Sequence, residues 1–189
     1  MKRIGIVGGT GYTGIELLRM LVNHTKVEVA YLTSRSEAGN SVASLYPWLD
    51  HYDALEFEAP SIERLCHCDL VFYATPNQIA MHEAPELLNR GVKLIDLAAD
   101  FRFSDATVWQ SIYGAPHASP ELLCDAVYGL PEIYRDRIKD AFLVGNPGCY
   151  PTASTLALLP LIEFGHLDLE NVILDGKSGA SGAGRNPRT

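Results

Sequence analysis

The sequence predicts an α/β fold, a doubly wound parallel sheet, over roughly its first three-quarters. Apolar runs of strand length recur along the chain, and segments with helically spaced apolar residues separate them. A glycine-rich turn follows the first of these runs. Hydrophobic residues make up 47% of the 189 positions, which is enough for a sizeable buried core. The start of a second, α+β domain is expected after this sheet.

The expected strands are short apolar runs bounded by turn residues. They lie at 3–7, 27–32, 69–74, 92–97 and 141–144, with two shorter runs at 53–57 and 172–174. Helices are expected from the glycine-rich turn through Val22 and from Thr152 to Phe164. Pro85 interrupts a third helical pattern, which is expected to begin at that proline. Tyr46-Pro47-Trp48 is expected to be a loop, and residues 104–140 a turn-rich excursion between two strands.

The first glycine-rich turn joins a strand to a helix and matches the pattern G-x-G-x-x-G between Gly9 and Gly14. The strand before it, the helix after it and the second strand complete a βαβ unit of the length that dinucleotide sites require. Glycines let the backbone approach a pyrophosphate, which then lies at the helix N-terminus. A Rossmann-type dinucleotide site is therefore predicted at Gly8, Gly9, Thr10, Gly11, Tyr12, Thr13 and Gly14.

The residues after the second strand favour one cofactor over another. Enzymes that use NAD usually place an Asp or Glu there, which accepts hydrogen bonds from the ribose hydroxyls. This chain has Thr33-Ser34-Arg35-Ser36 instead. The hydroxyl of Ser34 and the guanidinium of Arg35 suit a 2′-phosphate, which an acidic side chain would repel. NADP(H) is therefore the expected cofactor, although a solvated arginine in a turn is the simpler alternative.

A single cysteine lies at a turn between a strand and a helix, in the stretch Gly145-Asn146-Pro147-Gly148-Cys149-Tyr150-Pro151-Thr152. The first N–H groups of a helix and its dipole favour the thiolate form of a nearby thiol. Pro151 is expected at the first helical position, which needs no N–H donor. Cys149 is thus a candidate nucleophile, and a buried structural cysteine is the alternative.

Two later segments have polar or charged groups that suit ligands. Arg102 could bind a carboxylate or phosphate of a substrate, or it could pair with Asp100 or Asp105 at the surface. The glycine- and serine-rich segment from Asp175 to Arg185, which contains Gly176-Lys177-Ser178, could close over a cofactor with its N–H groups, or it could be a terminal tail. It is not a P-loop, because Asn171 stands where that motif needs glycine.

Composition argues against several other classes of protein. The formal net charge is −8, and no run of Lys and Arg offers a surface for nucleic acid or membrane. The apolar start is too short for a signal peptide and no later run has transmembrane length, so a cytoplasmic protein is expected. Cys66-His67-Cys68 has no second Cys/His pair at zinc-site spacing, and no metal is expected.

Taken together, the motifs resemble one known family. Gly8–Gly14 with Ile15-Glu16-Leu17, Asp100-Phe101-Arg102, Tyr128–Glu132, Pro147–Thr152 and Lys177–Arg185 are similar to the N-acetyl-gamma-glutamyl-phosphate reductases, the arginine-biosynthesis members of the semialdehyde dehydrogenase superfamily. The resemblance covers essentially the whole chain. It implies NADPH-dependent reductive dephosphorylation of N-acetyl-glutamyl 5-phosphate to N-acetyl-glutamate 5-semialdehyde, with release of phosphate, through a thioester.

The resemblance also implies roles for particular residues. Cys149 would be the nucleophile, and the Gly8–Gly14 loop would hold NADP(H) with Ser34, Arg35, Ser178 and Gly179. The expected substrate ligands are Arg102, Asn146 and Arg185. The expected domains are an NADP-binding domain at 1–145 and the beginning of a catalytic or substrate domain at 146–189. A homo-oligomer, either a dimer or a tetramer, is expected at full length.

The chain departs from the family in two respects. The family often has Leu-Pro-His-Gly where this chain has Thr75-Pro76-Asn77-Gln78, so the resemblance assigns no cofactor contact to that loop. The family's chain also continues well beyond position 189 and contains its general acid/base histidine there, so an N-terminal fragment is expected. Three alternatives remain: a reductase of aspartyl phosphate or of carrier-linked aminoadipyl phosphate, a non-catalytic NADP-binding module, and a glycine-loop nucleotide hydrolase.

Overall fold

A six-stranded parallel sheet forms the centre of the molecule. The computed structural model describes residues 1–184. The strand order is β2-β1-β3-β4-β6-β5, and every neighbouring pair is parallel. The sheet therefore grows in both directions from β1, as expected for a doubly wound fold. The strands are β1 (Lys2–Val7), β2 (Val27–Thr33), β3 (Leu70–Tyr73), β4 (Lys93–Asp96), β5 (Val127–Tyr128) and β6 (Leu143–Gly145).

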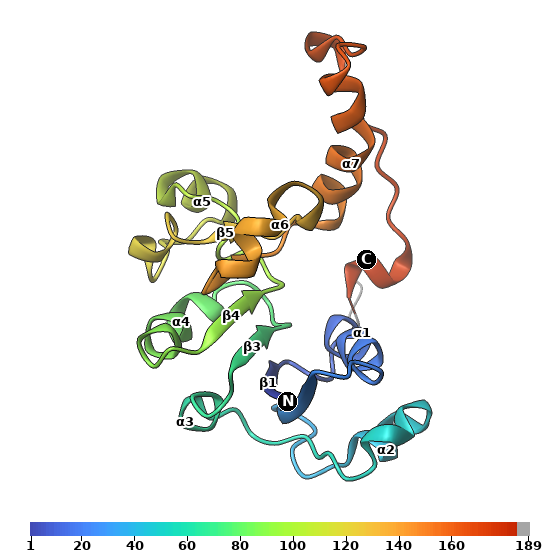
Figure 1. Cartoon of the computed structure of the whole chain (residues 1–189), viewed down its shortest axis with the longest axis vertical. Helices are drawn as coiled ribbons and strands as arrows, with labels where there is room; N and C mark the ends of the chain where they lie inside the picture. Colours follow the sequence, from blue (N-terminus) through green and yellow to red (C-terminus); the bar gives the residue numbers. More distant parts are fainter. Residues whose placement is uncertain (185–189) are drawn as a thin grey trace.

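Helices cover both faces of this sheet (Figure 1). On one face lie α1 (Tyr12–Leu21), α2 (Val42–Leu45) and the 3-10 helix η1 (Pro47–Tyr52), whose apolar side chains pack with Ile4 and Ile6. On the other face lie α3 (Ile62–Leu65), α4 (Ala80–Asn89) and α5 (Ala106–Tyr113), which pack with Val71 and Leu94. Neighbouring residues of a strand point to opposite faces, so β1, β2 and β3 contribute apolar side chains to both clusters.

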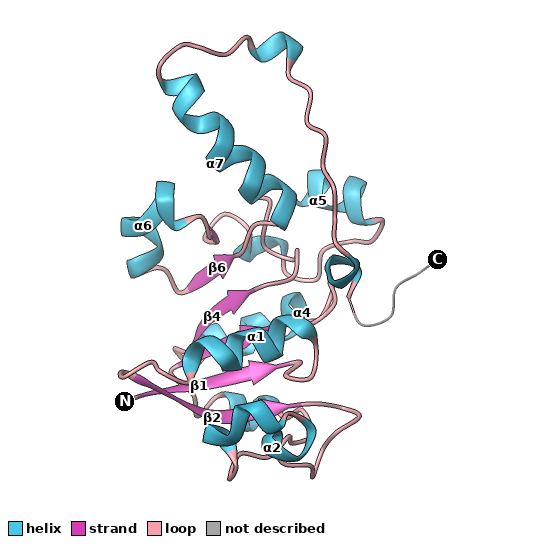
Figure 2. Ribbon diagram, turned by 90° about the vertical axis from the view of Figure 1, so that its right-hand side faces the viewer, coloured by secondary structure: helices cyan, strands magenta, loops and turns pink. Residues whose placement is uncertain are grey.

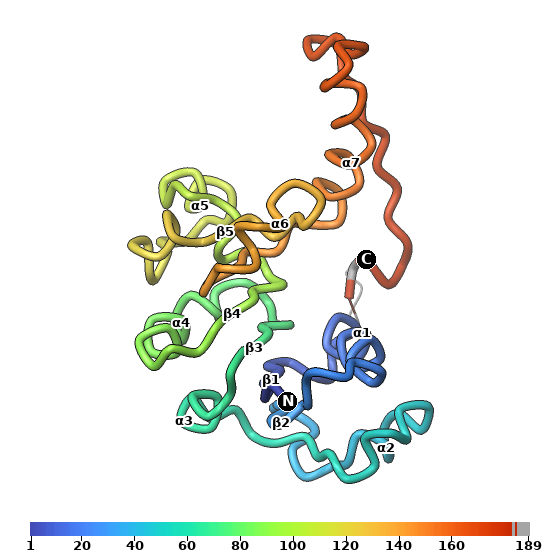
Figure 3. Tube along the Cα trace, viewed as in Figure 1, coloured from blue at the N-terminus to red at the C-terminus, as the bar shows by residue number. Residues whose placement is uncertain are grey.

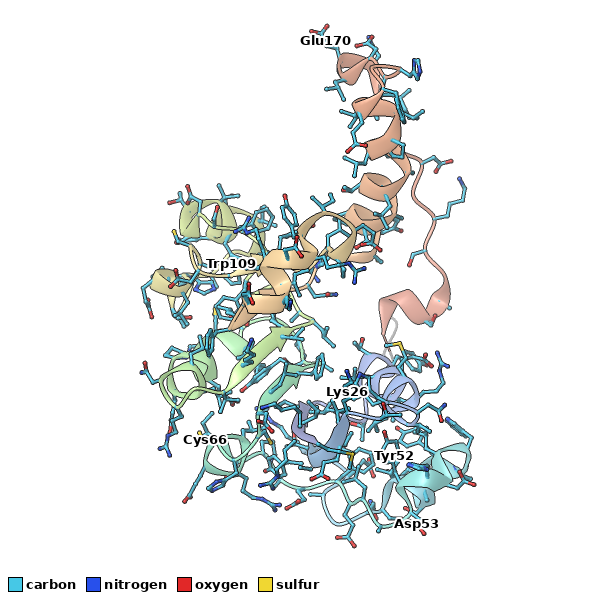
Figure 4. The ribbon with its side chains drawn as sticks, viewed as in Figure 1. Lys26, Tyr52, Asp53, Cys66, Trp109 and Glu170 are labelled. Atoms are coloured by element: carbon cyan, nitrogen blue, oxygen red, sulfur yellow. The ribbon has the colours of Figure 1, made fainter. Side chains whose placement is uncertain are left out.

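The last long helix extends away from the sheet. This helix, α7 (Cys149–Glu163), has no buried residue and rises beyond the β6 end of the sheet (Figure 2). Glu170, in the 3-10 helix η3 (Leu169–Asn171), lies at the far tip of this arm (Figure 4). The chain then returns toward α1, where η4 (Ala180–Ala183) lies (Figure 3). The ring of Tyr150 lies close to the returning backbone, since a Cβ built on Gly176 would lie 2.5 Å from Cε1 of this tyrosine.

The expectation that a helix begins at Pro85 is wrong. The helix α4 begins at Ala80 and contains Pro85 in its interior. A proline has no N–H for the carbonyl four residues earlier, that of Met81, which instead accepts a 2.9 Å hydrogen bond from the hydroxyl of Ser119. At the start of α4, the carboxylate of Asp100 accepts hydrogen bonds from the backbone N–H groups of Gln78 and Met81. Residues from elsewhere in the chain therefore supply hydrogen-bond partners for the N–H groups at the start of α4 and for the carbonyl of Met81.

Other local expectations need correction. Residues 53–57 form only an isolated antiparallel bridge, between Glu56 and Ser41, and residues 172–174 lie outside any strand. The expected loop Tyr46-Pro47-Trp48 instead leads into the helix η1, with its proline at the first position. Residues 104–140 contain α5, a 3-10 helix η2 (Pro120–Leu122), the edge strand β5 and α6 (Pro131–Asp140). None of the helices in the described part of the chain is long and apolar enough to cross a membrane.

Candidate active site

Four strands end at the same level of the sheet. Val7 of β1, Tyr73 of β3, Asp96 of β4 and Gly145 of β6 are paired in register across the sheet. The loops that follow these residues therefore emerge from one edge, where open α/β sheets bind their ligands. The glycine-rich loop follows β1 and the Cys149 turn follows β6, three inter-strand spacings away, or about 14 Å.

Glycines shape the loop between β1 and α1. Gly8 has a φ of +86°, and a Cβ there would lie 2.5 Å from the carbonyl oxygen of Ala74. A Cβ on Gly14 would lie 2.5 Å from the carbonyl oxygen of Gly8, so this glycine allows α1 to approach the loop. Gly11 is the N-cap of α1, and no side chain caps the N–H groups that follow it. The first turn of α1 also has no acidic residue, so these N–H groups suit an anion such as a pyrophosphate.

A cavity of about 650 Å³ lies beside this loop, and we call it the edge cavity. The glycine loop, the ends of β2 and β3 and the beginning of α4 contribute to its lining. Of the residues predicted for a cofactor, it brings together Gly8, Thr10, Gly11, Ser34 and Arg35. The buried hydroxyl of Ser34 lies 3.2 Å from that of Thr10 and accepts a hydrogen bond from the N–H of Glu37.

Two unsatisfied hydroxyl groups support a polar ligand in the edge cavity. The Oγ1 atoms of Thr33 and Thr75 are buried and have no hydrogen-bond partner within the described residues, and both threonines line this cavity. A buried hydroxyl without a partner is costly, so such groups indicate hydrogen bonds that a ligand completes. The exposed Arg35 adds a positive charge. The residues present therefore fit a phosphorylated dinucleotide.

A second, larger cavity of about 1030 Å³, the face cavity, lies between α1 and the sheet surface of β3, β4 and β6. Tyr12 and Thr13 line it, whereas Gly9 and Gly14 are buried by close packing. From the returning C-terminal segment, Ser181 and Gly182 reach this cavity. Ser178 and Gly179, which were predicted for the cofactor, are exposed and line neither cavity.

Cys149 is the first residue of α7, with Gly148 as its N-cap, and it is exposed. The helix therefore begins earlier than expected, and Pro151 occupies its third position rather than its first. The third N–H of a helix also has no intrahelical partner, so a proline fits there equally well. The carbonyl oxygen of Gly148 accepts hydrogen bonds from the N–H and from the hydroxyl of Thr152, which closes the first turn.

The turn that leads to Cys149 is tied to the neighbouring strand end. The backbone N–H of Asn146 donates to the carbonyl oxygen of Asp96 over 2.8 Å. Arg102, which is half-buried, donates from Nε to the carbonyl oxygen of Asn146 and from Nη2 to that of Leu97. Arg102 thus contacts backbone, with no ion pair to Asp100 or Asp105 among the described residues. Asn146 lines the face cavity, and Arg185 lies outside the described residues.

Several residues of the edge cavity were not singled out from the sequence as ligands, namely Thr33, Pro60, Thr75, Ile79 and Glu83. Position after a strand was the available signal for Thr33 and Thr75. Glu83 had no such signal, because its place depends on how α4 packs. Cys66 is half-buried and Cys68 buried, and no group of three or more His, Cys, Asp or Glu in residues 1–184 could hold a metal ion.

Comparison with known proteins bears directly on this arrangement. The chain is 59% identical over 186 residues to an N-acetyl-gamma-glutamyl-phosphate reductase of Nitrosospira multiformis, and 54% identical over 189 residues to one of Pseudomonas aeruginosa. The alignments cover 98% and 100% of this chain but 54% and 55% of those proteins, so the chain spans about half the length of the relatives it matches.

Solved structures share the fold. Aspartate semialdehyde dehydrogenase II of Vibrio cholerae, complexed with ASA, superposes with a TM-score of 0.62 at 18% identity, over 86% of this chain and 47% of that one. The Candida albicans aspartate semialdehyde dehydrogenase with NADP gives 0.61 at 18% identity, over 88% and 48%.

Family models match both parts of the chain. The dimerisation domain of semialdehyde dehydrogenases matches residues 149–189, which begin at the candidate nucleophile. The NAD binding domain of the same family matches residues 3–141, which contain the glycine-rich loop and the edge cavity. The sheet, the loop and the sequence therefore agree that this chain belongs to the semialdehyde dehydrogenase family.

Proposed function

We propose that the protein reduces N-acetyl-glutamyl 5-phosphate to N-acetyl-glutamate 5-semialdehyde with NADPH, a step of arginine biosynthesis. The observation that carries this proposal is the position of Cys149. Its exposed thiol begins α7 at the sheet edge that also carries the glycine-rich loop. The names of relatives that are 54–59% identical to this chain support the choice of substrate.

The proposed chemistry begins at the sulfur of Cys149. The thiolate attacks the acyl carbon, a C–S bond forms, and the C–O bond to phosphate breaks, which leaves a thioester and free phosphate. NADPH, when bound, supplies the hydride that reduces this thioester. The resulting thiohemiacetal collapses, its C–S bond breaks, and the aldehyde and the thiolate separate. A thiolate serves well because it is a good nucleophile near neutral pH and later a good leaving group.

Other residues of the chain would bind and orient the reactants. In the proposed complex, the N–H groups of the glycine loop hold the pyrophosphate, and the hydroxyls of Thr33 and Thr75 complete their hydrogen bonds on the cofactor. Ser34 and Arg35 hold the 2′-phosphate. Asn146 and Arg102 lie next to the Cys149 turn and are proposed to orient the substrate there. None of the six histidines lines either cavity, so we assign proton transfer to no histidine of residues 1–184.

The domain organisation is also a proposal. Residues 1–145 would form the NADP-binding domain, and residues 146–189 would begin the catalytic and dimerisation domain. Ser178, Gly179 and Arg185 would serve the cofactor and substrate from this second part. A homo-oligomer and a cytoplasmic location accord with the dimerisation-domain match and with a biosynthetic role.

A comparison of two cysteine variants tests the proposal. The protein at its full natural length is prepared as Cys149→Ser and Cys124→Ser; both cysteines are exposed, but Cys124 lies in the segment between α5 and β5. Cys149→Ser should lose nearly all phosphate-dependent NADP reduction with N-acetylglutamate semialdehyde while its dissociation constant for NADPH stays unchanged. Cys124→Ser should keep normal turnover and normal NADPH binding.

The proposal also predicts a covalent intermediate. Incubation with the acyl phosphate in the absence of NADPH should add one N-acetylglutamyl group to Cys149, visible by intact mass and peptide mapping. Retained turnover in Cys149→Ser would overturn the assignment of the nucleophile. Faster reduction of aspartyl phosphate than of N-acetyl-glutamyl phosphate would instead overturn the assignment of the substrate.

A further inference from the structure

The lining of the edge cavity contains two chemically different groups of residues. One group consists of the glycine loop, Ser34 and the cationic Arg35, which suit phosphates. The other group consists of the apolar side chains of Pro60, Pro76 and Ile79, together with a single carboxylate, that of Glu83. Apolar walls with one well-placed polar group are typical of a subsite that binds a flat ring and reads its edge.

A hydrogen bond from a buried tyrosine fixes the carboxylate of Glu83. The hydroxyl of Tyr73 donates to Oε2 of Glu83 over 2.6 Å. Tyr73 is fully buried, and its burial, together with the nearby Glu83, raises the pKa of the phenol, so the tyrosine stays a neutral donor. The other carboxylate oxygen, Oε1, has no hydrogen bond to any residue between 1 and 184. Glu83 therefore offers one fixed, unoccupied acceptor to the cavity.

The position of Glu83 on its helix supports contact with a base rather than with a sugar. Glu83 follows Ile79 by four residues at the start of α4, so the two side chains lie on one side of that helix. The apolar Ile79 can cover the face of a ring while Glu83 reaches its edge. Acids that bind ribose hydroxyls in this fold stand at the end of β2, where this chain has Ser34 and Arg35. A carboxylate next to the 2′-phosphate would also repel it, so Glu83 suits the edge of the adenine that points away from the ribose.

We propose that Glu83, held by Tyr73, reads the exocyclic amino group of the adenine and makes the edge cavity selective for adenine over bases with a carbonyl oxygen at that position. This inference rests on the proposed function, since it takes the occupant of the cavity to be NADPH. A carboxylate oxygen accepts a hydrogen bond from the amino group of adenine. At the same exocyclic position hypoxanthine presents only the lone pairs of a carbonyl oxygen, which gives the carboxylate no donor there.

Binding of two cofactors that differ only in this group tests the proposal. Dissociation constants for NADPH and for reduced nicotinamide hypoxanthine dinucleotide phosphate are measured by calorimetry on the protein at its full natural length. The wild type should prefer NADPH by at least about tenfold, the factor expected when an acceptor with a full charge loses its donor. In Glu83→Gln this preference should fall to near unity, because the amide can turn its NH2 group toward a carbonyl oxygen.

Two further variants complete the design. Glu86→Gln removes a carboxylate from the same helix, one that pairs with Arg90 and does not line the cavity, and it should keep the wild-type preference. Tyr73→Phe keeps the buried ring but frees Oε2, so it should reduce the preference part of the way. Thermal melting of each variant identifies any that fails to fold, in which case the wild-type ratio alone decides.

The possible outcomes separate this inference from the proposed function. Equal binding of the two cofactors to the wild type would overturn the proposed contact between Glu83 and the adenine, although NADPH would still be the cofactor. Equal weakening of both cofactors in Glu83→Gln would also overturn it, since that result indicates contact with the sugar or phosphate. Absence of any NADPH binding would overturn the inference and the proposed function together.

Discussion

The guanidinium of Arg102 donates a 2.7 Å hydrogen bond from Nε to the carbonyl oxygen of Asn146, three residues before Cys149. A second bond, from Nη2 to the carbonyl oxygen of Leu97, joins the same side chain to the loop after β4. Gly148 lies next to this group, since a Cβ there would be 3.4 Å from Nη1, in van der Waals contact. One arginine therefore ties the backbone that carries the candidate nucleophile to the neighbouring strand end.

This arrangement predicts that Arg102 positions Cys149 even when no substrate is bound. Arg102→Lys keeps the charge but lacks the planar fork whose separate nitrogens, Nε and Nη2, reach the two carbonyl groups. We expect the rate of Cys149 alkylation by iodoacetamide and the rate of turnover to fall together. Turnover should fall by roughly ten- to hundredfold, because small displacements of a reacting group cause losses of that size. Arg137→Lys, an exposed position on α6, is the control. If alkylation stays normal while KM alone rises, Arg102 binds substrate and does not position the turn.

The position of Arg35 predicts that the protein prefers NADPH over NADH. Its side chain is exposed beside the edge cavity and has no ion pair within residues 1–184. In Arg35→Ala, the dissociation constant for NADPH should rise about ten- to hundredfold, the effect of losing a charged hydrogen bond to the 2′-phosphate. The dissociation constant for NADH should change little. Arg135→Ala on α6 controls for general loss of positive charge, and equal weakening of both cofactors would argue against a 2′-phosphate contact.

The interrupted helix α4 predicts a coupling between Ser119 and Pro85. The fully buried Ser119 donates to the carbonyl of Met81, which Pro85 cannot reach with an N–H. Ser119→Ala should cost about 1–3 kcal/mol in the free energy of unfolding, because it leaves that carbonyl without a donor. In a Pro85→Ala background the cost should be smaller by about 1 kcal/mol, since the alanine introduced there supplies its own N–H. Urea unfolding of the four proteins measures this cycle, and additive effects would contradict the explanation.

The parts of the site that depend on neighbouring residues could be predicted from the sequence. The glycine loop and the Cys149 turn each lie within one strand-turn-helix unit, so spacing alone indicated them. The start of α4 could not be predicted, because it depends on Asp100 and Ser119, which lie 19 or more residues away from the backbone groups they satisfy. Glu83 was missed for a similar reason, since Tyr73 and the packing of α4 place it in the cavity.

In the C-terminal loop, the sequence pattern and the structure point to different residues of one segment. A glycine- and serine-rich stretch was expected to approach the cofactor with Ser178 and Gly179. The returning chain instead brings Ser181 and Gly182 to the face cavity, next to Tyr12 and Thr13. Where the loop touches α1 depends on the length of the α7 arm and on the contact of Tyr150 with Gly176, neither of which a local pattern contains.

A buried acid predicts how stability varies with pH. Asp96 is completely buried, and burial together with the charge of Asp100 raises its pKa from 3.8 to about 7. The native state therefore keeps a proton that the unfolded chain loses near pH 4. Between about pH 4 and pH 7 the native state binds more protons, so the free energy of unfolding should fall as the pH rises through that window.

Substitution of Asp96 tests this prediction. Asp96→Asn removes the titrating group, so its free energy of unfolding should fall less between pH 5 and pH 8 than that of the wild type, even if it is lower at pH 5 through a lost hydrogen bond to Ala98 or Asp100. Asp105→Asn is the matched control. Hydrogen bonds from Thr107 and Val108 lower the pKa of Asp105, so its stabilising effect is lost only at more acidic pH. Urea unfolding at several pH values measures all three proteins, and parallel curves for wild type and Asp96→Asn would refute the assignment. The carbonyl oxygen of Asp96 accepts a hydrogen bond from the N–H of Asn146. A displacement of the Asp96 backbone would therefore also displace the turn that carries Cys149.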